Sequence, residues 1–441
     1  MPLHEIPTPP KPGQGRLHDL VEGKKKAILV GTYLNAKDKT QCEEQLEELE
    51  SLGNTYGLIT ALKLPCPIRQ YESATFIGSG KAEEIKALIA EHQCDLVIFD
   101  DEISPQQQRN LEKLLERVVI DRTELILGVF AQRAQTREAR IQIELATFRY
   151  QMPRLRRMWT HLSRQRSGGA GAGFTKGEGE KQIEIDRRIV RRQVDRLQED
   201  LEEIKKQRKT QRRWRERSGI PTFAIIGYTN VGKSTLLRSL TDADVLVEDK
   251  LFATLDPTTR KFVLPNRQAI LLVDTVGFIR KIPHLLVASF KSTLEEAVQA
   301  DILLHLIDVS NPNAQKQAEA TFEVLKELEA TQRPMITVLN KVDKCENRMM
   351  ISRLKLKYPK TVEISALNKT GFDDLMQMMI REISLLRKTV HLRVPQSHYA
   401  LVSEVMREGK VISCEYEAND ILLDVEIPCH LEKKVAHFEI L

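Results

Sequence analysis

Short apolar runs alternate with amphipathic stretches from about residue 26 to residue 130. The pattern predicts buried strands and helices in turn, at residues 26–31, 43–49, 58–64, 81–91, 95–99, 104–115 and 118–120. We expect the first helix to stop near Gly53, and Ser104 with Pro105 to cap the third. This alternation predicts an N-terminal α/β domain over residues 24–130, with a mostly parallel sheet, preceded by a flexible tail over residues 1–23.

One stretch of this domain, Gly78-Ser79-Gly80-Lys81, invites comparison with phosphate-binding loops. It lacks the four-residue gap between the glycines, and neither Ser nor Thr follows the lysine. We therefore favour a plain loop at the start of a helix.

From Thr136 onward the apolar spacing becomes that of long helices. Two stripes follow one another, formed by Ile141, Leu145, Phe148, Met152, Leu155, Trp159 and Leu162, and then by Ile183, Val190, Val194, Leu197, Leu201 and Ile204. They predict an antiparallel helical hairpin over residues 131–218, with a kink at Pro153. We interpret the stripes themselves as packing surfaces.

A Gly-rich loop over residues 167–179 connects the two helices, and its glycines lead us to expect no regular structure there. Basic residues gather on both sides of it: Arg154, Arg156, Arg157, Arg187, Arg188, Arg191, Arg192 and Arg196, then Lys205, Lys206, Arg208, Lys209, Arg212, Arg213, Arg215 and Arg217. This density favours a polyphosphate partner, most economically RNA, over a solvated linker with charged helix faces.

Residues 219–388 carry the motifs of a nucleotide-binding domain. An apolar strand at 222–226 leads into a P-loop, whose residues are Gly227, Tyr228, Thr229, Asn230, Val231, Gly232, Lys233, Ser234 and Thr235. The backbone amides of such a loop surround phosphate oxygens, and the following helix adds its N-terminal partial charge. We expect Lys233 to reach the β- and γ-phosphates and the Ser234 hydroxyl to hold Mg²⁺.

Two later segments have the residue types of GTPase switches. The first is the Thr-rich loop at 251–260, in which the nucleotide-binding candidates are Phe252, Ala253, Thr254, Leu255 and Asp256. Thr254 is our candidate for a second hydroxyl on Mg²⁺. The second segment, after a buried strand at 270–273, is Asp274, Thr275, Val276 and Gly277. Asp274 would contact Mg²⁺ through water, and the Gly277 amide would sense the γ-phosphate. We therefore assign catalysis to Lys233, Thr254 and Gly277.

Guanine specificity is predicted by two loops at the ends of later strands. The first loop is Asn340, Lys341, Val342 and Asp343, and the second is Ser365, Ala366 and Leu367. The Asp343 carboxylate can accept hydrogen bonds from both N1 and N2 of guanine, and adenine offers no such pair of donors. The Ala366 amide would lie near guanine O6. The order of all five motifs predicts a P-loop GTPase.

Two residues bear on the mechanism. Phe278 follows Gly277, where Ras-like enzymes have a glutamine that orients the attacking water. We therefore expect weak intrinsic hydrolysis that a bound partner stimulates. Asn230 lies inside the P-loop, and a second hypothesis is that it holds K⁺ beside the phosphates.

Composition changes this interpretation little. The chain has 441 residues, a net charge of +5 and 41% apolar residues. No apolar run approaches the roughly 18 residues of a membrane helix, and the six cysteines form no CxxC pair, which is typical of reduced thiols. We expect a cytoplasmic protein without stable membrane insertion, monomeric in solution.

After residue 388, strand-like runs at 390–394, 411–416 and 421–427 accompany a helix candidate at 398–408. They predict a small α+β domain over residues 389–441. The expected fold class is thus α/β, with a P-loop GTPase domain, an N-terminal α/β domain, a helical-hairpin arm and this terminal domain.

From about residue 26 to 441 the chain resembles the HflX family of the Obg–HflX group of GTPases. The segments that carry the resemblance are 99–112, 121–127, 177–180, 186–188, 227–235 and 252–258. The resemblance implies that the N-terminal domain and the arm contact the large (50S) ribosomal subunit and its rRNA, with the Gly-rich tip near the peptidyl transferase centre. It also implies ribosome splitting, rescue or subunit biogenesis, and association with ribosomes or peripherally with a membrane.

The Gly-rich tip departs from the family pattern, which usually reads close to Gly-Gly-Ile-Gly-Thr-Arg-Gly-Pro-Gly-Glu-Thr-Gln. Here the loop is longer and lacks the proline, so we expect its ribosomal contacts to differ. Some members hydrolyse ATP through the N-terminal domain, but no motif supports that activity in this chain. Two rival functions stay open: a ribosome-independent regulatory GTPase, and an ATP-driven RNA remodeller with a regulatory GTP site.

Overall fold

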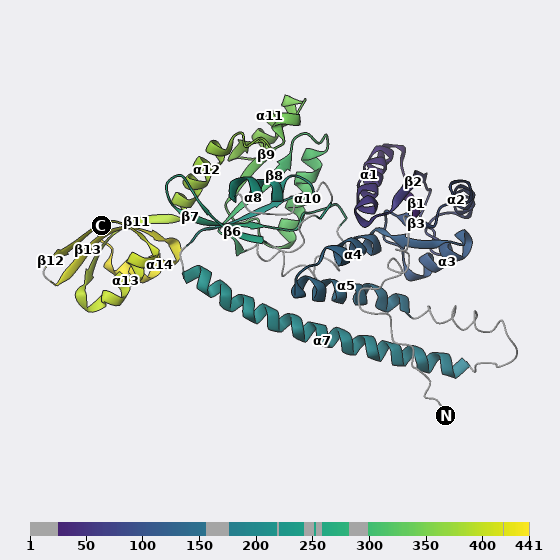
Figure 1. Ribbon diagram of the computed structural model, residues 1–441, viewed down its shortest axis with the longest axis horizontal. Helices are drawn as coiled ribbons and strands as arrows, with labels where there is room; N and C mark the ends of the chain where they lie inside the picture. The colour runs from purple at the N-terminus through teal and green to yellow at the C-terminus, as the bar shows by residue number, and fades with distance from the viewer. Residues whose placement is uncertain are drawn as a thin grey trace. The chain divides into compact units, whose positions relative to one another are not determined.

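The computed structural model describes residues 25–155, 176–217, 220–241, 251–252, 258–281, 299–417 and 419–440. The chain forms two compact units. The first comprises Met1–Glu203 with the segments Glu248–Asp256 and Lys281–Lys291. The second comprises Ile204–Val247, Pro257–Arg280 and Ser292–Leu441. Figure 1 traces the elements from the purple N-terminal strands to the yellow C-terminal ones.

The first unit begins with strands and helices in strict alternation. The elements are β1 (Lys26–Tyr33), α1 (Lys39–Tyr56), β2 (Ile59–Pro67), α2 (Ser79–His92), β3 (Leu96–Phe99), α3 (Pro105–Leu115) and β4 (Val118–Asp121). The sheet has the order β2-β1-β3-β4, and every neighbouring pair is parallel. The predicted α/β domain with its parallel sheet is therefore confirmed.

Local chemistry sets the helix ends of this domain. Ser104 accepts a hydrogen bond from the Gln107 amide, and the Gln107 side chain bonds the Ser104 amide, so a capping box opens α3. The prediction that α1 stops near Gly53 is wrong, because Gly53 is buried within the helix. The helix ends at Tyr56, and Gly57 adopts the left-handed φ of 101° that terminates helices. Gly78 is the N-cap residue of α2, so the stretch Gly78-Ser79-Gly80-Lys81 is the start of a helix, as predicted.

Two further helices follow β4. The sequence pattern did not indicate α4 (Arg122–Arg133), which Asp121 caps by accepting the Glu124 amide at 2.9 Å. In α5 (Arg137–Leu155), Ile141 and Leu145 of the predicted stripe are buried. Pro153 lies in the last turn of α5, and the region of its predicted kink, with Trp159 and Leu162, continues outside the described residues.

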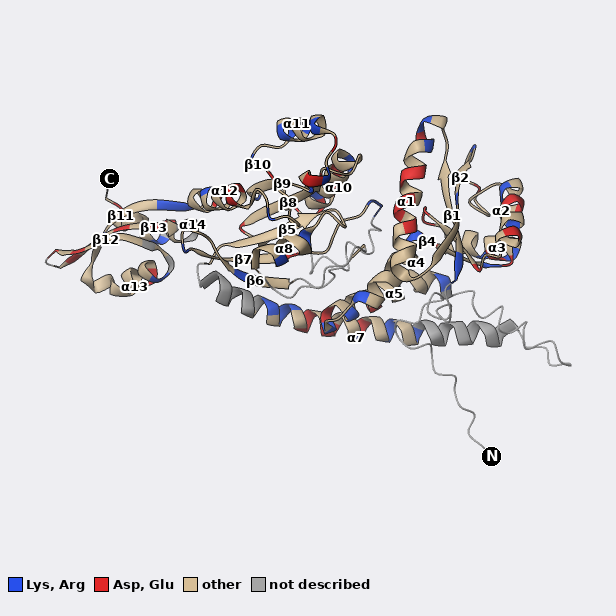
Figure 2. Ribbon diagram, turned by 45° about the horizontal axis from the view of Figure 1, so that its top comes forward, with Lys and Arg blue, Asp and Glu red and all other residues tan. Residues whose placement is uncertain are grey.

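The second arm helix, α7 (Lys176–Arg217), is 42 residues long. It runs beside α5, and Arg137 in the first turn of α5 lies 3.4 Å from Asp200 of α7 (Figure 2). Val194 and Leu201 of the predicted stripe are buried. The prediction of no regular structure over 167–179 is wrong at its end, because α7 starts at Lys176. The glycines at 177 and 179 cost about 1 kcal/mol each, which a long helix tolerates. Residues 167–175 lie outside the described part.

The second unit contains the six-stranded sheet of the P-loop domain. Its elements are β5 (Thr222–Gly227), α8 (Lys233–Thr241), β6 (Thr258–Val263), β7 (Ala269–Asp274), β8 (Ile302–Asp308), α10 (Ala314–Glu327), β9 (Met335–Asn340), α11 (Arg348–Lys357), β10 (Thr361–Glu363) and α12 (Phe372–Leu385). The order is β10-β9-β8-β5-β7-β6, parallel except for β6. Strand β6 corrects the loop predicted at 251–260, because residues 258–260 pair with β7. The central β5 carries the P-loop at its carboxyl end.

The chain ends in a small antiparallel sheet with helices. The elements are β11 (Arg387–Pro395), α13 (Tyr399–Glu408), β12 (Lys410–Glu417), β13 (Asp420–Pro428) and α14 (Cys429–Val435). The strand order is β11-β13-β12, and Val390, Leu423 and Leu431 belong to one buried core. This is the predicted α+β arrangement. In the described part of the chain, none of the helices has both the length and the apolar character needed to cross a bilayer.

Candidate active site

The loop between β5 and α8 has a backbone that demands small residues. Three of its residues have positive φ: Gly227 at 149°, Asn230 at 60° and Gly232 at 96°. A Cβ on Gly232 would lie 2.4 Å from Asn340 Nδ2, and a Cβ on Gly227 would lie 2.5 Å from the carbonyl oxygen of Leu306. Both glycines are therefore required for the loop to pack against the neighbouring strands.

Three polar side chains converge at the mouth of this loop. Lys233 is buried, and its Nζ donates to the carbonyl oxygens of Tyr228 at 2.7 Å and Gly227 at 3.2 Å. Burial lowers the pKa of Lys233 to about 8, although the Asp274 carboxylate acts in the opposite direction. The Ser234 hydroxyl donates to Asp274 Oδ2 at 2.7 Å. An ammonium, a hydroxyl and a carboxylate in this arrangement suit phosphate groups with a hard divalent cation.

The segment after β7 packs directly onto the P-loop. The Phe278 amide donates to the carbonyl of Gly227 at 3.1 Å, and the Thr229 amide donates to the carbonyl of Phe278 at 2.7 Å. A Cβ on Gly277 would lie 2.9 Å from Lys233 Nζ and 2.7 Å from the Thr229 methyl carbon, so a larger residue would collide here. Phe278 is 1% exposed. A buried apolar ring cannot orient an attacking water.

The predicted guanine loops meet through one buried amide side chain. Asn340 Nδ2 donates to the carbonyl of Val231 at 2.8 Å, and Asn340 Oδ1 accepts the Ala366 amide at 2.9 Å. Lys341 Nζ reaches the carbonyl of Asn230 at 2.8 Å and also pairs with Asp308 at 2.7 Å. Asn340 thus joins the P-loop to the second of the predicted guanine loops.

Asp308 is a site residue that sequence reasoning did not assign. It ends β8 and orients Lys341 toward the P-loop, and its position at the end of a central strand was the available signal. Asp343 lies in the short helical turn Val342–Lys344 and is exposed. Its carboxylate therefore needs no displacement of a packed neighbour before it can meet a base.

The structure brings most predicted nucleotide contacts to one edge of the sheet. These are residues 227–235, 274–277, 340–343 and 365–367. Phe252 instead packs edge-on against Phe130 of α4 within the first unit, with 4.5 Å between ring centroids. Ala253, Thr254, Leu255 and Asp256 lie outside the described residues.

A parallel sheet that delivers a P-loop, an Asp-x-x-Gly segment and an Asn-Lys-x-Asp loop to one edge defines a P-loop GTPase. Three family models match consecutive stretches: "GTP-binding GTPase N-terminal" over residues 43–131, "GTP-binding GTPase Middle Region" over 133–215 and "50S ribosome-binding GTPase" over 222–341. The chain belongs to the HflX family of GTPases, and it therefore hydrolyses GTP to GDP and phosphate.

Curated relatives support this membership along nearly the whole chain. GTPase HflX of Chlamydia pneumoniae is 47% identical over 413 residues, which cover 93% of this chain and 88% of the relative. GTPase HflX of Escherichia coli is 42% identical over 415 residues, covering 93% of this chain and 96% of the relative. A solved GTP-binding protein from Sulfolobus solfataricus in complex with GDP is 25% identical, with a TM-score of 0.43 over 82% of this chain and 99% of that one.

Proposed function

We propose that this GTPase binds the large (50S) ribosomal subunit through its arm and that the bound subunit stimulates GTP hydrolysis. The role would be ribosome splitting or rescue, or subunit biogenesis, in the cytoplasm. The observation that carries the proposal is a row of exposed arginines on α7, considered together with the "50S ribosome-binding GTPase" family that matches residues 222–341.

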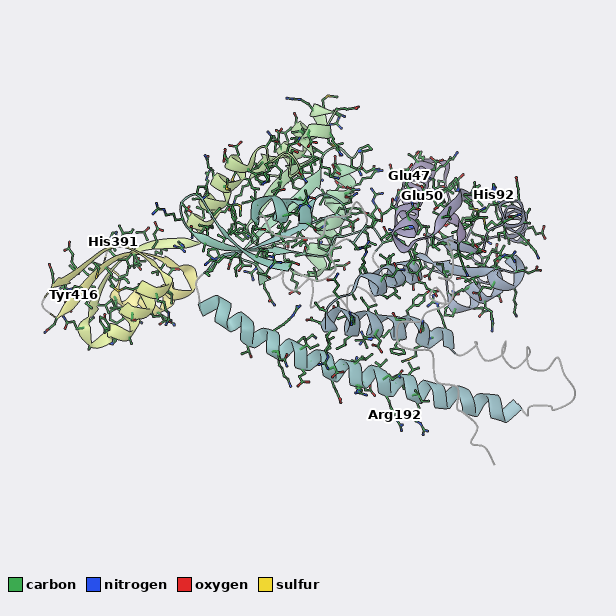
Figure 3. The ribbon with its side chains drawn as sticks, in the orientation of Figure 1. Glu47, Glu50, His92, Arg192, His391 and Tyr416 are labelled. Atoms are coloured by element: carbon green, nitrogen blue, oxygen red, sulfur yellow. The ribbon has the colours of Figure 1, made fainter. Side chains whose placement is uncertain are left out.

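The arginine row has the spacing of one helix face. Arg188, Arg192 and Arg196 follow one another at four-residue intervals, and Arg191 lies beside them; all four are exposed. Figure 3 shows the labelled Arg192 side chain extending away from α7. Several guanidinium groups along one rigid helix match the repeated phosphates of an RNA backbone.

Arg154 does not belong to this basic surface, which corrects the cluster expected from the sequence. Its guanidinium lies 3.2 Å from the buried Asp121 carboxylate and 3.6 Å from the centroid of the Tyr150 ring. Only 13% of its side chain is exposed. Arg154 therefore stabilises the junction of α4 and α5, and Arg156 and Arg157 lie outside the described residues.

The site residues fit a nucleotide with Mg²⁺. Ser234 and Asp274 would hold the cation, which supplies charge neutralisation to the phosphates when bound. Lys233 binds the phosphate oxygens, and Gly277 presents its amide where only a residue without a Cβ fits against the P-loop. The Asp343 carboxylate recognises guanine. The Ala366 amide, which we expected near guanine O6, instead donates to Asn340 Oδ1 at 2.9 Å, which corrects that expectation. Thr254 remains the proposed second hydroxyl ligand.

A partner that stimulates hydrolysis is supported by Phe278. Because its ring is buried, the group that orients the attacking water must come from another segment or from a bound partner. Asn230, at φ 60° in the P-loop, is also proposed to hold K⁺ beside the phosphates. Equal turnover in K⁺ and Na⁺ would remove this part of the proposal.

The test is GTP turnover measured with and without purified 50S subunits, together with salt-sensitive cosedimentation. A double variant, Arg188→Ala with Arg192→Ala, should lose cosedimentation and stimulation and keep its unstimulated rate. The matched control is Arg348→Ala with Arg353→Ala, because these arginines are also exposed on a helix, α11. Absence of any stimulation of the unmodified protein would remove the ribosomal function and favour a ribosome-independent regulatory GTPase.

A further inference from the structure

The hydroxyl of Thr229 in the P-loop is a buried polar group without a partner. Thr229 is 5% exposed, and among the described residues its Oγ1 makes no hydrogen bond. Two other buried threonines of the same domain use their hydroxyls. Thr275 Oγ1 donates to the carbonyl oxygen of Ile225 at 2.7 Å. Thr321 Oγ1, on α10, donates to the carbonyl oxygen of Gln317 at 3.0 Å. Thr229 differs from both, and an unsatisfied buried group of this kind calls for a physical explanation.

An unpaired hydroxyl at this position is unfavourable for the fold alone. Burial removes the hydroxyl from water, and without a protein partner the lost hydrogen bonds are not replaced. A valine has nearly the same shape and would fill the same space with a methyl group. The nucleotide-free fold therefore gains nothing from the Thr229 hydroxyl, which points to a hydrogen-bond partner that arrives with the substrate.

Main-chain hydrogen bonds hold Thr229 against the segment after β7. The Thr229 amide donates to the carbonyl oxygen of Phe278 at 2.7 Å, and the Phe278 amide donates to the carbonyl oxygen of Gly227 at 3.1 Å. Tyr228 and Phe278 thereby form a short parallel bridge. All of these residues belong to one compact unit. The position of the Thr229 side chain is thus set by contacts that do not involve its hydroxyl.

The Thr229 side chain lies beside the expected position of the γ-phosphate. A Cβ on Gly277 would lie 2.7 Å from the Thr229 methyl carbon and 2.9 Å from Lys233 Nζ. Thr229, Gly277 and Lys233 therefore border one small space. When a triphosphate binds, its γ-phosphate has to reach both the lysine of the P-loop and the Gly277 amide. Thr229 is then an immediate neighbour of the reacting phosphate.

Hydrolysis requires a polar group that the residue after Gly277 does not supply. The attacking water has to be held in line with the bond that breaks, and a glutamine performs this task in Ras-like enzymes. Here the corresponding residue is Phe278, whose buried side chain contains no polar atom. A threonine hydroxyl has one donor hydrogen and two acceptor lone pairs. It can therefore accept a hydrogen bond from a water molecule while it donates one to a phosphate oxygen.

We propose that Thr229 is a catalytic residue whose hydroxyl orients the attacking water in GTP hydrolysis. The hydroxyl donates to a γ-phosphate oxygen and accepts a hydrogen bond from the water. The water oxygen forms a bond to the γ-phosphorus while the bond from that phosphorus to the bridging β-phosphate oxygen breaks. One water proton passes to a γ-phosphate oxygen, so the products are GDP and dihydrogen phosphate. The inference concerns the unstimulated reaction and does not depend on the proposed ribosomal partner.

The test is single-turnover GTP hydrolysis by the full-length chain, with the protein in saturating excess, Mg²⁺ present and no ribosomal subunits. Thr229→Val keeps the shape of the side chain and loses the hydroxyl, so its rate constant should fall by about 10- to 100-fold. Thr229→Ser keeps the hydroxyl and should stay within about threefold of the unmodified chain. The Kd for GDP, which has no γ-phosphate, should change by less than about twofold in both variants.

Further variants separate catalysis from folding and from background activity. Thr321→Val removes a buried hydroxyl from α10 and should hydrolyse GTP at the rate of the unmodified chain. Lys233→Ala gives the background from contaminating enzymes. Circular dichroism melting checks that each variant folds, and Thr229→Ala replaces Thr229→Val if the valine variant unfolds. An unchanged rate in the folded variant without the hydroxyl, an equal loss in Thr229→Ser, or a matching loss of GDP affinity would each overturn the proposal.

Discussion

A histidine in the centre of the GTPase sheet should make the stability of that domain sensitive to acid. His305 lies in β8 and is fully buried, and its ring packs edge-on against Phe322 and Tyr358, with centroids 5.1 and 6.0 Å away. Among the described residues, neither of its ring nitrogens has a hydrogen-bond partner. Burial lowers the pKa of His305 from 6.5 to about 3. The folded domain therefore holds the ring neutral over the whole physiological range.

The magnitude follows from linkage between protonation and folding. Because the pKa is depressed in the folded state, the unfolded chain binds the proton more readily. The free energy of unfolding is thus unaffected above pH 6.5, and it falls as the pH drops from 6.5 toward 3. Each unit of pH in this window costs about 1.4 kcal/mol. At pH 5 the loss from this one residue is about 2 kcal/mol.

The perturbation is His305→Leu, which keeps a similar volume and removes both ring nitrogens. Urea unfolding followed by circular dichroism at pH 7.5 and pH 5 gives the free energy of unfolding. Between these two values, the unmodified chain should lose about 2 kcal/mol more than the variant. At pH 7.5 the variant should be at least as stable, because an unbonded buried polar group costs about 1–3 kcal/mol. His92→Leu, at the end of α2, is the control and should behave as the unmodified chain does. An equal loss in His305→Leu and in the unmodified chain would refute the reasoning.

Two further predictions concern the nucleotide site. Asp343→Asn should weaken GTP binding by about 100-fold and improve binding of xanthosine triphosphate, because the amide offers a donor where guanine also presents donors; nucleotide competition measures both, and retained guanine preference would contradict the assignment. The free-state pKa of Lys233 near 8 predicts a pH effect on affinity, since bound phosphates favour the charged ammonium. GTP affinity should be constant below pH 8 and should fall by up to about tenfold per unit above it, which titration between pH 7 and 9.5 would check.

The elements with strong local signals were predictable from the sequence. Strand β5 is an apolar run, and the P-loop after it contains a pair of glycines at a fixed spacing, Gly227 and Gly232. The sequence therefore shows directly that small residues are required there. The order of the strand-end motifs then fixed the sheet edge at which Asp274, Asn340 and Ala366 meet. The capping box at Ser104 was readable because both of its side chains are near neighbours in sequence.

Features that depend on distant parts of the chain were not predictable in this way. Helix α4 lacks a clean apolar stripe because most of its residues are buried, and these include charged ones such as Arg122. The Arg122 side chain is paired with Glu48, which is distant in sequence. Arg154 resembled its surface neighbours in the sequence, and only the fold shows that it neutralises Asp121. Likewise, the pairing of Lys281 with Asp100 spans 181 residues, and no local pattern encodes it.

The length of α7 gives the arm a mechanical property. At about 1.5 Å per residue, 42 helical residues form a rod about 63 Å long, and the rod ends only four residues before β5, the strand that carries the P-loop. If a rod of this length tilts by about 5° about one end, its other end moves by about 5 Å. Small movements of the backbone before the nucleotide site can therefore become displacements as large as a nucleotide base at the far end of the arm.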